Sequence, residues 1–211
     1  MYKDVFSDAE IVQRKALWRV LVTHFFQRYV EPGDTVLDIG SGWGEFINEI
    51  RARRRAAIDV SDEYRRYHEP GLLYSLQSCC QMGFKDAAVD VVFASNVFEH
   101  LASRDDLMAA LVEIRRILRP GGRLLVLQPN FKYCYREYFD IFDHYQAYTH
   151  VSMREILQLS GFHIRELHPR FLPFSTKQRL PQAAWLVKLY LAMPVWWRIF
   201  GKQMFIVAER A

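Results

Sequence analysis

The stretch that most constrains this chain starts at Val36 and has the sequence VLDIGSGWGEF. A short apolar run leads into Asp38, and glycine then occupies every second position from Gly40 to Gly44. Apolar residues resume at helical spacing directly afterwards. This pattern predicts a buried strand, a tight turn and a helix over about 44–53, which is where open α/β sheets bind nucleotides. Glycines in such a turn allow positive φ and let a ligand approach without a Cβ in the way.

The glycine spacing separates two classes of cofactor. A dinucleotide fingerprint G-x-G-x-x-G that began at Gly40 would need glycine at position 45, where the chain has Glu45. A carboxylate at a helix start would also repel the pyrophosphate that this position otherwise attracts. A nicotinamide-dependent oxidoreductase is therefore disfavoured.

The pattern Asp38-x-Gly40-x-Gly42-x-Gly44 resembles motif I of the class I S-adenosylmethionine-dependent methyltransferases, and specifically their type 11-like small-molecule family. Further parts of the family pattern follow in order, ending with a helix, Pro-Gly-Gly and a strand that runs up to Asn130. The resemblance implies an α/β fold with a Rossmann-like doubly wound sheet of seven strands. Its expected order is 3-2-1-4-5-7-6, with strand 7 antiparallel.

An acid and a polar strand end extend the predicted cofactor site. Asp59 ends a short strand about 20 residues after Gly40, close to the spacing at which such sheets hold ribose hydroxyls, although a plain strand-end role is the alternative. Ser78 stands where the family usually has an acid facing adenine, which departs from the family pattern; backbone groups around Cys79 and Cys80 or apolar packing by Met82 are the alternatives. The run 89–101 resembles motif IV, whose strand end lies near the methionine part of the cofactor. The resemblance assigns cofactor binding to Asp38, Gly40, Ser41, Gly42, Gly44, Asp59, Val60, Ser78, Ser95 and Asn96.

Three side chains are candidates for proton transfer. His100 follows the motif IV strand, and a neutral imidazole there can accept a proton from a hydroxyl as the methyl group arrives. The alternative is that His100 only shapes the turn or pairs with Glu99. His144 and Tyr145 lie in an aromatic loop on the ligand side of the sheet. His144 and His150 lack a third ligand at metal-site spacing, so no metal is predicted.

The chain is expected to form one domain over 1–211, with an N-terminal helical cap at 1–31 and a helical insertion at 170–201. The segment 185–200 combines tryptophans with basic residues. Such a surface suits peripheral contact with a membrane or a lipid-linked substrate. We favour a different role for this segment over membrane or lipid contact: a flap packed on the sheet, or on a second subunit in a homodimer.

Composition and sequence motifs argue against several other classes of protein. The net charge of +4 is mild and no long basic tail occurs, so nucleic acid is not an expected partner. Asn96 is followed by Val-Phe rather than Pro-Pro, which argues against methylation of an exocyclic base nitrogen. Three cysteines, two of them adjacent, form no disulfide framework, and no signal peptide or membrane-spanning run is visible. A cytoplasmic protein is expected.

The sequence therefore predicts methyl transfer from S-adenosylmethionine to a small-molecule, saccharide or lipid-linked acceptor. The alternative is a protein that binds S-adenosylmethionine without catalysis, as a sensor or partner subunit. Intact cofactor residues are compatible with both, because binding and chemistry use different side chains.

Overall fold

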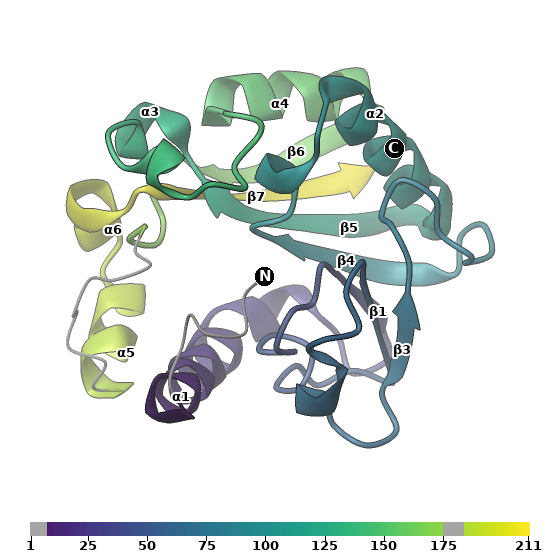
Figure 1. The fold of residues 1–211 in the computed structure, drawn as a ribbon, viewed down its shortest axis with the longest axis horizontal. Coiled ribbons are helices and arrows are strands. Elements are labelled where there is room, and N and C mark those ends of the chain that lie inside the picture. The colour runs from purple at the N-terminus through teal and green to yellow at the C-terminus, as the bar shows by residue number, and fades with distance from the viewer. Residues whose placement is uncertain (1–7, 175–183) are drawn as a thin grey trace.

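The computed structural model describes residues 8–174 and 184–211, and its centre is one seven-stranded sheet (Figure 1). The strands are β1 (Thr35–Ile39), β2 (Arg54–Asp59), β3 (Leu73–Leu76), β4 (Val89–Ser95), β5 (Leu118–Pro129), β6 (Phe162–His168) and β7 (Gln203–Arg210). Their order is β3-β2-β1-β4-β5-β7-β6, with β7 antiparallel to both β5 and β6 and the other pairs parallel. The predicted fold is confirmed.

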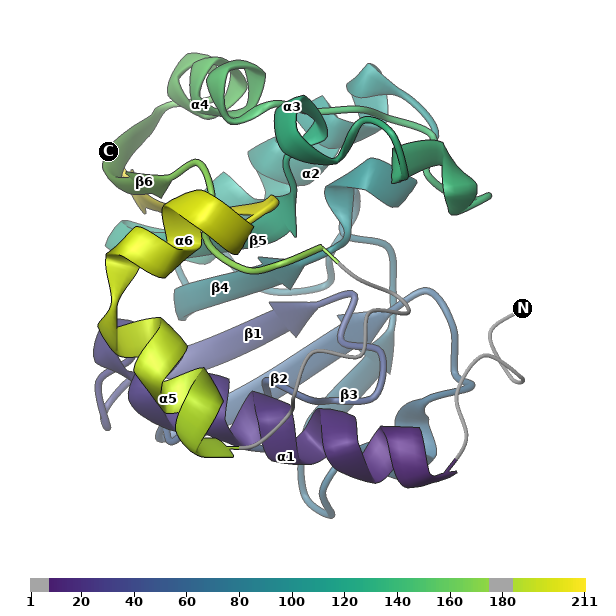
Figure 2. The same cartoon turned by 90° about the vertical axis from the view of Figure 1, so that its left-hand side faces the viewer.

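Helices cover both faces of this sheet (Figures 1 and 2). They are α1 (Asp8–His24), α2 (Arg104–Ile117), α3 (Phe131–Cys134), α4 (His150–Leu159), α5 (Ala184–Ala192) and α6 (Pro194–Phe200). Short 3₁₀ helices occupy Phe26–Tyr29, Arg65–Tyr67, Phe98–His100 and Tyr138–Asp140. α2 and α4 lie over one face, whereas α1 and α5 run side by side on the other (Figure 2). Within the described parts of the chain, no helix is long and apolar enough to cross a bilayer.

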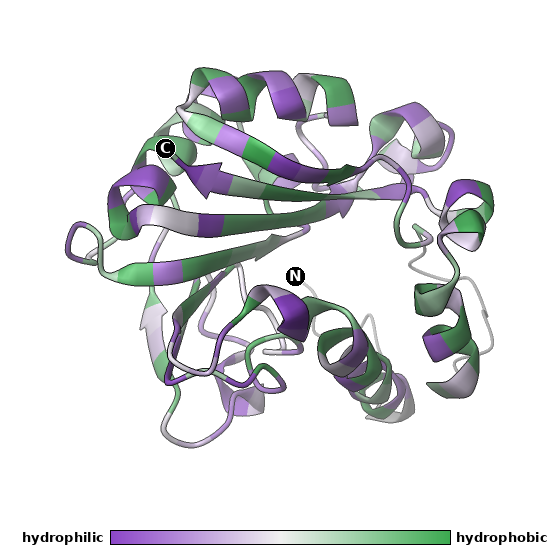
Figure 3. Cartoon of the chain, turned by 180° about the vertical axis from the view of Figure 1, so that it is seen from behind, coloured by the Kyte–Doolittle hydropathy of each residue, from purple (hydrophilic) through white to green (hydrophobic). Residues whose placement is uncertain are grey.

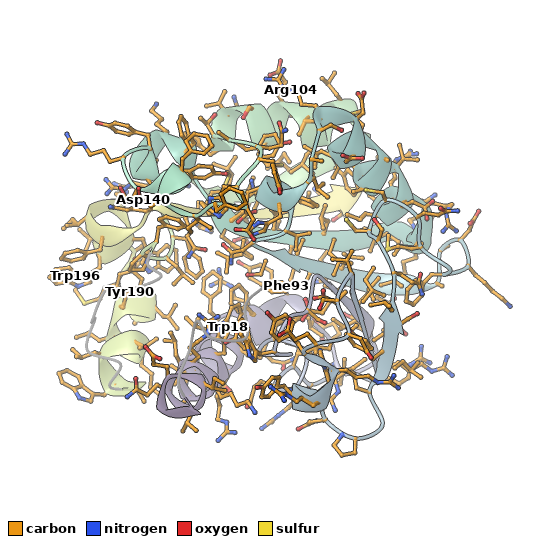
Figure 4. The ribbon with its side chains drawn as sticks, in the orientation of Figure 1. Trp18, Phe93, Arg104, Asp140, Tyr190 and Trp196 are labelled. Carbon is orange, nitrogen blue, oxygen red and sulfur yellow. The ribbon has the colours of Figure 1, made fainter. Side chains whose placement is uncertain are left out.

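Alternating side chains of each strand build two cores, because neighbouring residues of a strand point to opposite faces. On β4, Val92 and Ala94 pack in the core that includes α2 and α4. Val91 and Phe93 pack instead against α1. Figure 4 shows Trp18 of α1 directed toward Phe93, whose ring it meets edge-on at a centroid distance of 6.2 Å. Figure 3 shows that the central strands are rich in hydrophobic residues, whereas the helices have mixed polarity.

The helix expected over 44–53 is wrong: residues 42–49 form successive turns rather than a regular helix. The guanidinium of Arg55 donates to the carbonyls of Ile47 and Asn48 at 3.0 and 2.9 Å. The N–H of Arg51 donates to the side-chain oxygen of Gln27 at 2.9 Å. Long-range side chains therefore satisfy the groups that a continuing helix would have paired.

Other helix ends are set by local turns and caps. Within the cap expected over 1–31, α1 ends at His24 and a 3₁₀ turn follows it at Phe26–Tyr29. Thr149 is the N-cap of α4. The Thr149 hydroxyl accepts from the Ser152 N–H, and the Thr149 N–H donates to the Ser152 hydroxyl, which is a reciprocal capping box. Of the insertion 170–201, residues 175–183 lie outside the described residues.

Candidate active site

The glycine turn between β1 and β2 has a backbone that other residues rarely adopt. Gly40, Gly42 and Gly44 have φ angles of +63°, +46° and +70°. A Cβ at Gly40 would lie 2.6 Å from Cγ2 of Val97, the residue that follows Asn96 after β4. At Gly42, by contrast, a Cβ would meet no atom within 4 Å. The turn is therefore packed against the β4 end at Gly40 and leaves open space at Gly42, where a ligand can approach the backbone.

Asp59, at the end of β2, faces this turn. Its Oδ2 accepts from the N–H of Gly42 at 2.9 Å, and its Oδ1 accepts from the N–H of Ser61 at 3.0 Å. These bonds fix the carboxylate beside the turn, and each oxygen keeps capacity for one more donor. Two adjacent hydroxyls, such as those of a ribose, match that remaining capacity.

An aromatic pair stands beside the same carboxylate. The rings of Trp43 and Tyr64 lie 4.6 Å apart. Burial raises the pKa of Tyr64 to about 12, and Glu63 and Asp59 add to the shift. Tyr64 therefore keeps its proton at neutral pH and has an apolar ring and a donor hydroxyl close to Asp59. The sequence prediction did not include either aromatic residue.

Asp38 and Ser41 lie beneath the turn rather than at its open side. Asp38 is buried, and burial raises its pKa well above the ordinary range, with contributions from Asp59 and Glu45. The Ser41 hydroxyl is 3.0 Å from Nε2 of His68, whose own pKa is lowered by burial. Both predicted residues therefore support the turn from within the protein.

Glu45 does not present a free negative charge to a ligand. Arg14 of α1 donates to both of its oxygens at 2.7 and 3.0 Å. The expected repulsion of a pyrophosphate by Glu45 is therefore weak, because the charge is compensated. The argument against a dinucleotide then depends on the missing glycine at this position. The pair also links α1 to the glycine turn.

The carboxyl end of β4 contributes further residues to the site. Asn96 has a φ of +52°, a left-handed conformation that non-glycine residues adopt at a cost. Its N–H donates to the carbonyl of Leu127 at 2.8 Å, and its side-chain amide donates to the Ser95 hydroxyl at 3.0 Å. Val60 and Ser78 follow β2 and β3 at the same sheet edge, and both are exposed.

Directly after β4, the structure brings Glu99 and two histidines together. One ligand-type atom from each of Glu99, His100 and His144 lies within 4.8 Å of the others. Glu99 is completely buried, neither carboxylate oxygen has a hydrogen-bond partner, and burial raises its pKa to about 8. His144 is also buried, and burial together with His100 lowers its pKa to about 4. His144 is therefore neutral at pH 7.

The remaining loop candidates divide into those near this cluster and those away from it. The backbone N–H of Tyr145 donates to the Glu99 carbonyl at 2.9 Å, but its side chain is 57% exposed. Tyr148 is buried with an unpartnered hydroxyl, and Glu99 contributes to raising its pKa. His150 lies 2.9 Å from the side-chain amide of Asn130, so it is not the residue that joins His144.

Glu99 is the main residue that sequence reasoning undervalued, because its adjacency to His100 was read only as a pairing.

Comparison with known proteins agrees with this geometry. Residues 37–126 match the family model described as "Methyltransferase domain". Malonyl-[acyl-carrier protein] O-methyltransferase of Serratia marcescens is 36% identical over 99 residues, which are 44% of this chain and 38% of that protein. Ubiquinone/menaquinone biosynthesis C-methyltransferase UbiE of Cupriavidus metallidurans is 27% identical over 137 residues, covering 59% of this chain and 54% of that protein.

Solved structures share the fold over nearly the whole chain. A methyltransferase of Haloferax volcanii, solved in complex with the methyltransferase activator Trm112, has a TM-score of 0.69 at 23% identity, covering 96% of this chain and 94% of its own. A SAM-dependent methyltransferase of Archaeoglobus fulgidus has a TM-score of 0.69 at 17% identity, with coverage of 97% and 100%.

The segment that matches the methyltransferase model contains the glycine turn, Asp59, Glu99, His100 and most of β5, whereas His144 lies beyond it. The resemblance to the class I S-adenosylmethionine-dependent methyltransferases is thereby confirmed over residues 37–126. The prediction of S-adenosylmethionine as cofactor is thereby confirmed. The open space at Gly42 and the remaining acceptor capacity of Asp59 fit that group.

Proposed function

We propose that this chain transfers the methyl group of S-adenosylmethionine to a small-molecule, saccharide or lipid-linked acceptor. The observation that carries the proposal is the glycine turn held 2.9 Å from the Asp59 carboxylate, with open space at Gly42. The cofactor, when bound, supplies an electrophilic methyl carbon on a sulfonium that leaves as a neutral thioether. The protein then has to align the acceptor with that carbon, and alignment accounts for a large part of such catalysis.

The Glu99 cluster supports an acceptor that loses a proton. His144 is neutral at pH 7 because its pKa is lowered to about 4, so its imidazole is available to accept a proton, as a weaker base than an ordinary histidine. His100 lies beside it, with ring centroids 5.1 Å apart, and is the second candidate base. Tyr145 is the third, although its exposed ring contributes less to an enclosed site. The Serratia relative is named as an O-methyltransferase and the Cupriavidus relative as a C-methyltransferase, so the acceptor atom stays open.

A surface beyond the site supports contact with another partner. Trp185, Val195 and Trp196 of α5 and α6 are 65%, 55% and 37% exposed. Trp196 lies at the periphery in Figure 4. Peripheral contact with a membrane or a second subunit would cover these side chains. The Haloferax methyltransferase bound to Trm112 makes a protein partner a further candidate for this surface.

Two further assignments belong to the proposal. All three cysteines are free thiols, which supports a reducing compartment such as the cytoplasm. We also assign the chain to a single domain, with α1 as its cap and α5–α6 as an insertion between β6 and β7. No nucleic-acid partner is included.

The rival function is a non-catalytic S-adenosylmethionine-binding sensor or partner subunit, and turnover separates the two. Purified protein would be incubated with isotopically methyl-labelled cofactor and panels of hydroxylated metabolites, saccharides and lipid extracts. Label should enter one acceptor class with wild type and with Asp62→Ala, an exposed acid near the site. Asp59→Ala should lose the transfer. Cofactor binding without transfer to any acceptor class would favour the sensor.

A further inference from the structure

A buried carboxylate without partners is the most unusual feature among the described residues. Glu99 has no exposed surface, and both side-chain oxygens lack a hydrogen-bond partner. An uncompensated buried carboxylate costs several kcal/mol, so such a group is normally paired or bound to a metal. No basic Lys or Arg side chain is paired with it by any hydrogen bond or ion pair seen within 8–174 and 184–211. Glu99 therefore requires a cationic partner or its own proton.

Both neighbouring histidines have a ring nitrogen near Glu99 that can serve as a ligand. Nδ1 of His100 is 2.8 Å from the backbone carbonyl of Asp143, and a carbonyl can only accept. A proton of His100 is therefore on Nδ1, which leaves Nε2 as the ring nitrogen that can bind a metal ion. Histidine ligands of metals are commonly oriented in this way, with the other ring nitrogen donating to a carbonyl or carboxylate. The Asp143 carboxylate, 3.4 Å from the same Nδ1, adds to that orientation.

His144 completes the set from a distant part of the chain. It is buried, and its Nδ1 has no hydrogen-bond partner. The backbone bonds from Tyr145 and Gln146 to the Glu99 carbonyl, at 2.9 and 3.1 Å, hold this part of the loop over the β4 end. Two independent segments thus converge on one point with two imidazoles and one carboxylate.

The spacing of the three groups is close to that of a metal site. Even if all three ligand atoms were 4.8 Å apart, the point equidistant from them would lie roughly 2.8 Å from each. Bonds of about 2.1 Å then require movements of roughly 0.7 Å by each side chain, within the reach of small χ rotations. Two imidazoles and one carboxylate, with positions left open, suit Zn²⁺, Mn²⁺, Fe²⁺ or Co²⁺ rather than Ca²⁺ or Mg²⁺.

We propose that Glu99, His100 and His144 form a binding site for a divalent transition-metal ion at the carboxyl end of β4. The ion replaces the missing partner of Glu99, and its open positions can take an oxygen of the acceptor. In that state His144 is a ligand and not a base, and the metal makes the hydroxyl more acidic. The inference rests on the geometry of the cluster and stands whether or not the proposed function holds.

The test uses the full chain, treated with a chelator, dialysed, and titrated with Co²⁺ under visible absorption and with Zn²⁺ in a calorimeter. Wild type should bind an equimolar ion and develop the visible d–d bands of low-coordinate Co²⁺. Glu99→Gln and His144→Ala should each weaken binding by roughly 100-fold or more, because loss of a supporting residue alone costs 10–100-fold. The matched control is His150→Ala, a histidine of the same loop region outside the cluster, which should keep wild-type binding.

Glu99→Gln preserves the shape of the side chain, so circular dichroism should confirm that this variant is folded. Absence of Co²⁺ bands in wild type, or unchanged binding by folded Glu99→Gln, would overturn the proposal. S-adenosylmethionine binding is measured separately on the same samples. Absence of metal binding by wild type, with intact cofactor binding, would therefore reject only the metal site and leave the proposed function in place.

Discussion

Two alanine substitutions in the glycine turn should have very different costs, although both sites have positive φ. Alanine in a left-handed conformation is disfavoured by about 1–2 kcal/mol. Gly42 has no atom within 4 Å of the added Cβ, so Gly42→Ala should lower the free energy of unfolding by about that amount only. At Gly40 the Cβ would lie 2.6 Å from Cγ2 of Val97, which adds an overpacking cost of about 1–3 kcal/mol.

The melting temperature of a chain of this size falls by roughly 3 °C for each kcal/mol. We therefore expect a decrease of roughly 4 °C for Gly42→Ala and roughly 10 °C for Gly40→Ala. Urea unfolding followed by circular dichroism gives the same difference as free energies. Cofactor affinity should fall for Gly42→Ala despite its small cost in stability, because the new methyl group projects into the open space of the turn.

A double-mutant cycle identifies the cause. Val97→Ala removes the side chain that the new Cβ would meet. It should therefore relieve most of the overpacking cost in Gly40→Ala. The same change should give no rescue in Gly42→Ala, which serves as the matched control. Equal costs for the two alanine variants, with no rescue by Val97→Ala, would refute the packing of the glycine turn against the β4 end.

Three further outcomes follow from the described contacts. The pKa of Glu99 is raised from 4.5 to about 8, so in chelator the folded state loses stability as pH rises between those values. The difference in free energy of unfolding between Glu99→Gln and wild type should therefore grow in favour of the variant by roughly 1.5 kcal/mol from pH 6.5 to 8. A difference that stays constant over this range would contradict a protonated Glu99. Arg14→Ala should lower the free energy of unfolding in urea by about 1 kcal/mol, because it removes the partly exposed ion pair with Glu45. The double variant Arg14→Ala/Glu45→Ala should lower it by no more than that. If α5 and α6 contact membranes, wild type should sediment with anionic vesicles and Trp185→Ala/Trp196→Ala should not; a wild type that stays in the supernatant rejects that contact.

The fold and the cofactor turn were predictable from sequence because their signals are local. Alternation of apolar residues, glycine at every second position and a strand-end acid at Asp59 each lie within a few residues. The strand order came from the family resemblance. The helix expected after Gly44 was wrong because its end is decided by Arg55 and Gln27, which lie elsewhere in the chain. No periodicity within 44–53 contains that information.

The Glu99 cluster shows a second limit of sequence reasoning. His100 and His144 were both candidates, but their convergence depends on the backbone of Tyr145 and Gln146 pairing with Glu99. The complete burial of Glu99, and the absence of a partner for it, are consequences of that folding. His144 was weighed with His150 because the two are close in sequence, whereas the structure joins His144 to His100 instead.

The central claim is that the turn from Gly40 to Gly44, together with Asp59, binds S-adenosylmethionine. Calorimetric titration of the purified chain with S-adenosylmethionine, and separately with NADH, tests it most directly. The account predicts saturable binding of S-adenosylmethionine that Asp59→Ala abolishes and Asp62→Ala retains, with no binding of NADH. Binding of NADH alone, or binding of S-adenosylmethionine that Asp59→Ala leaves unchanged, would contradict the account.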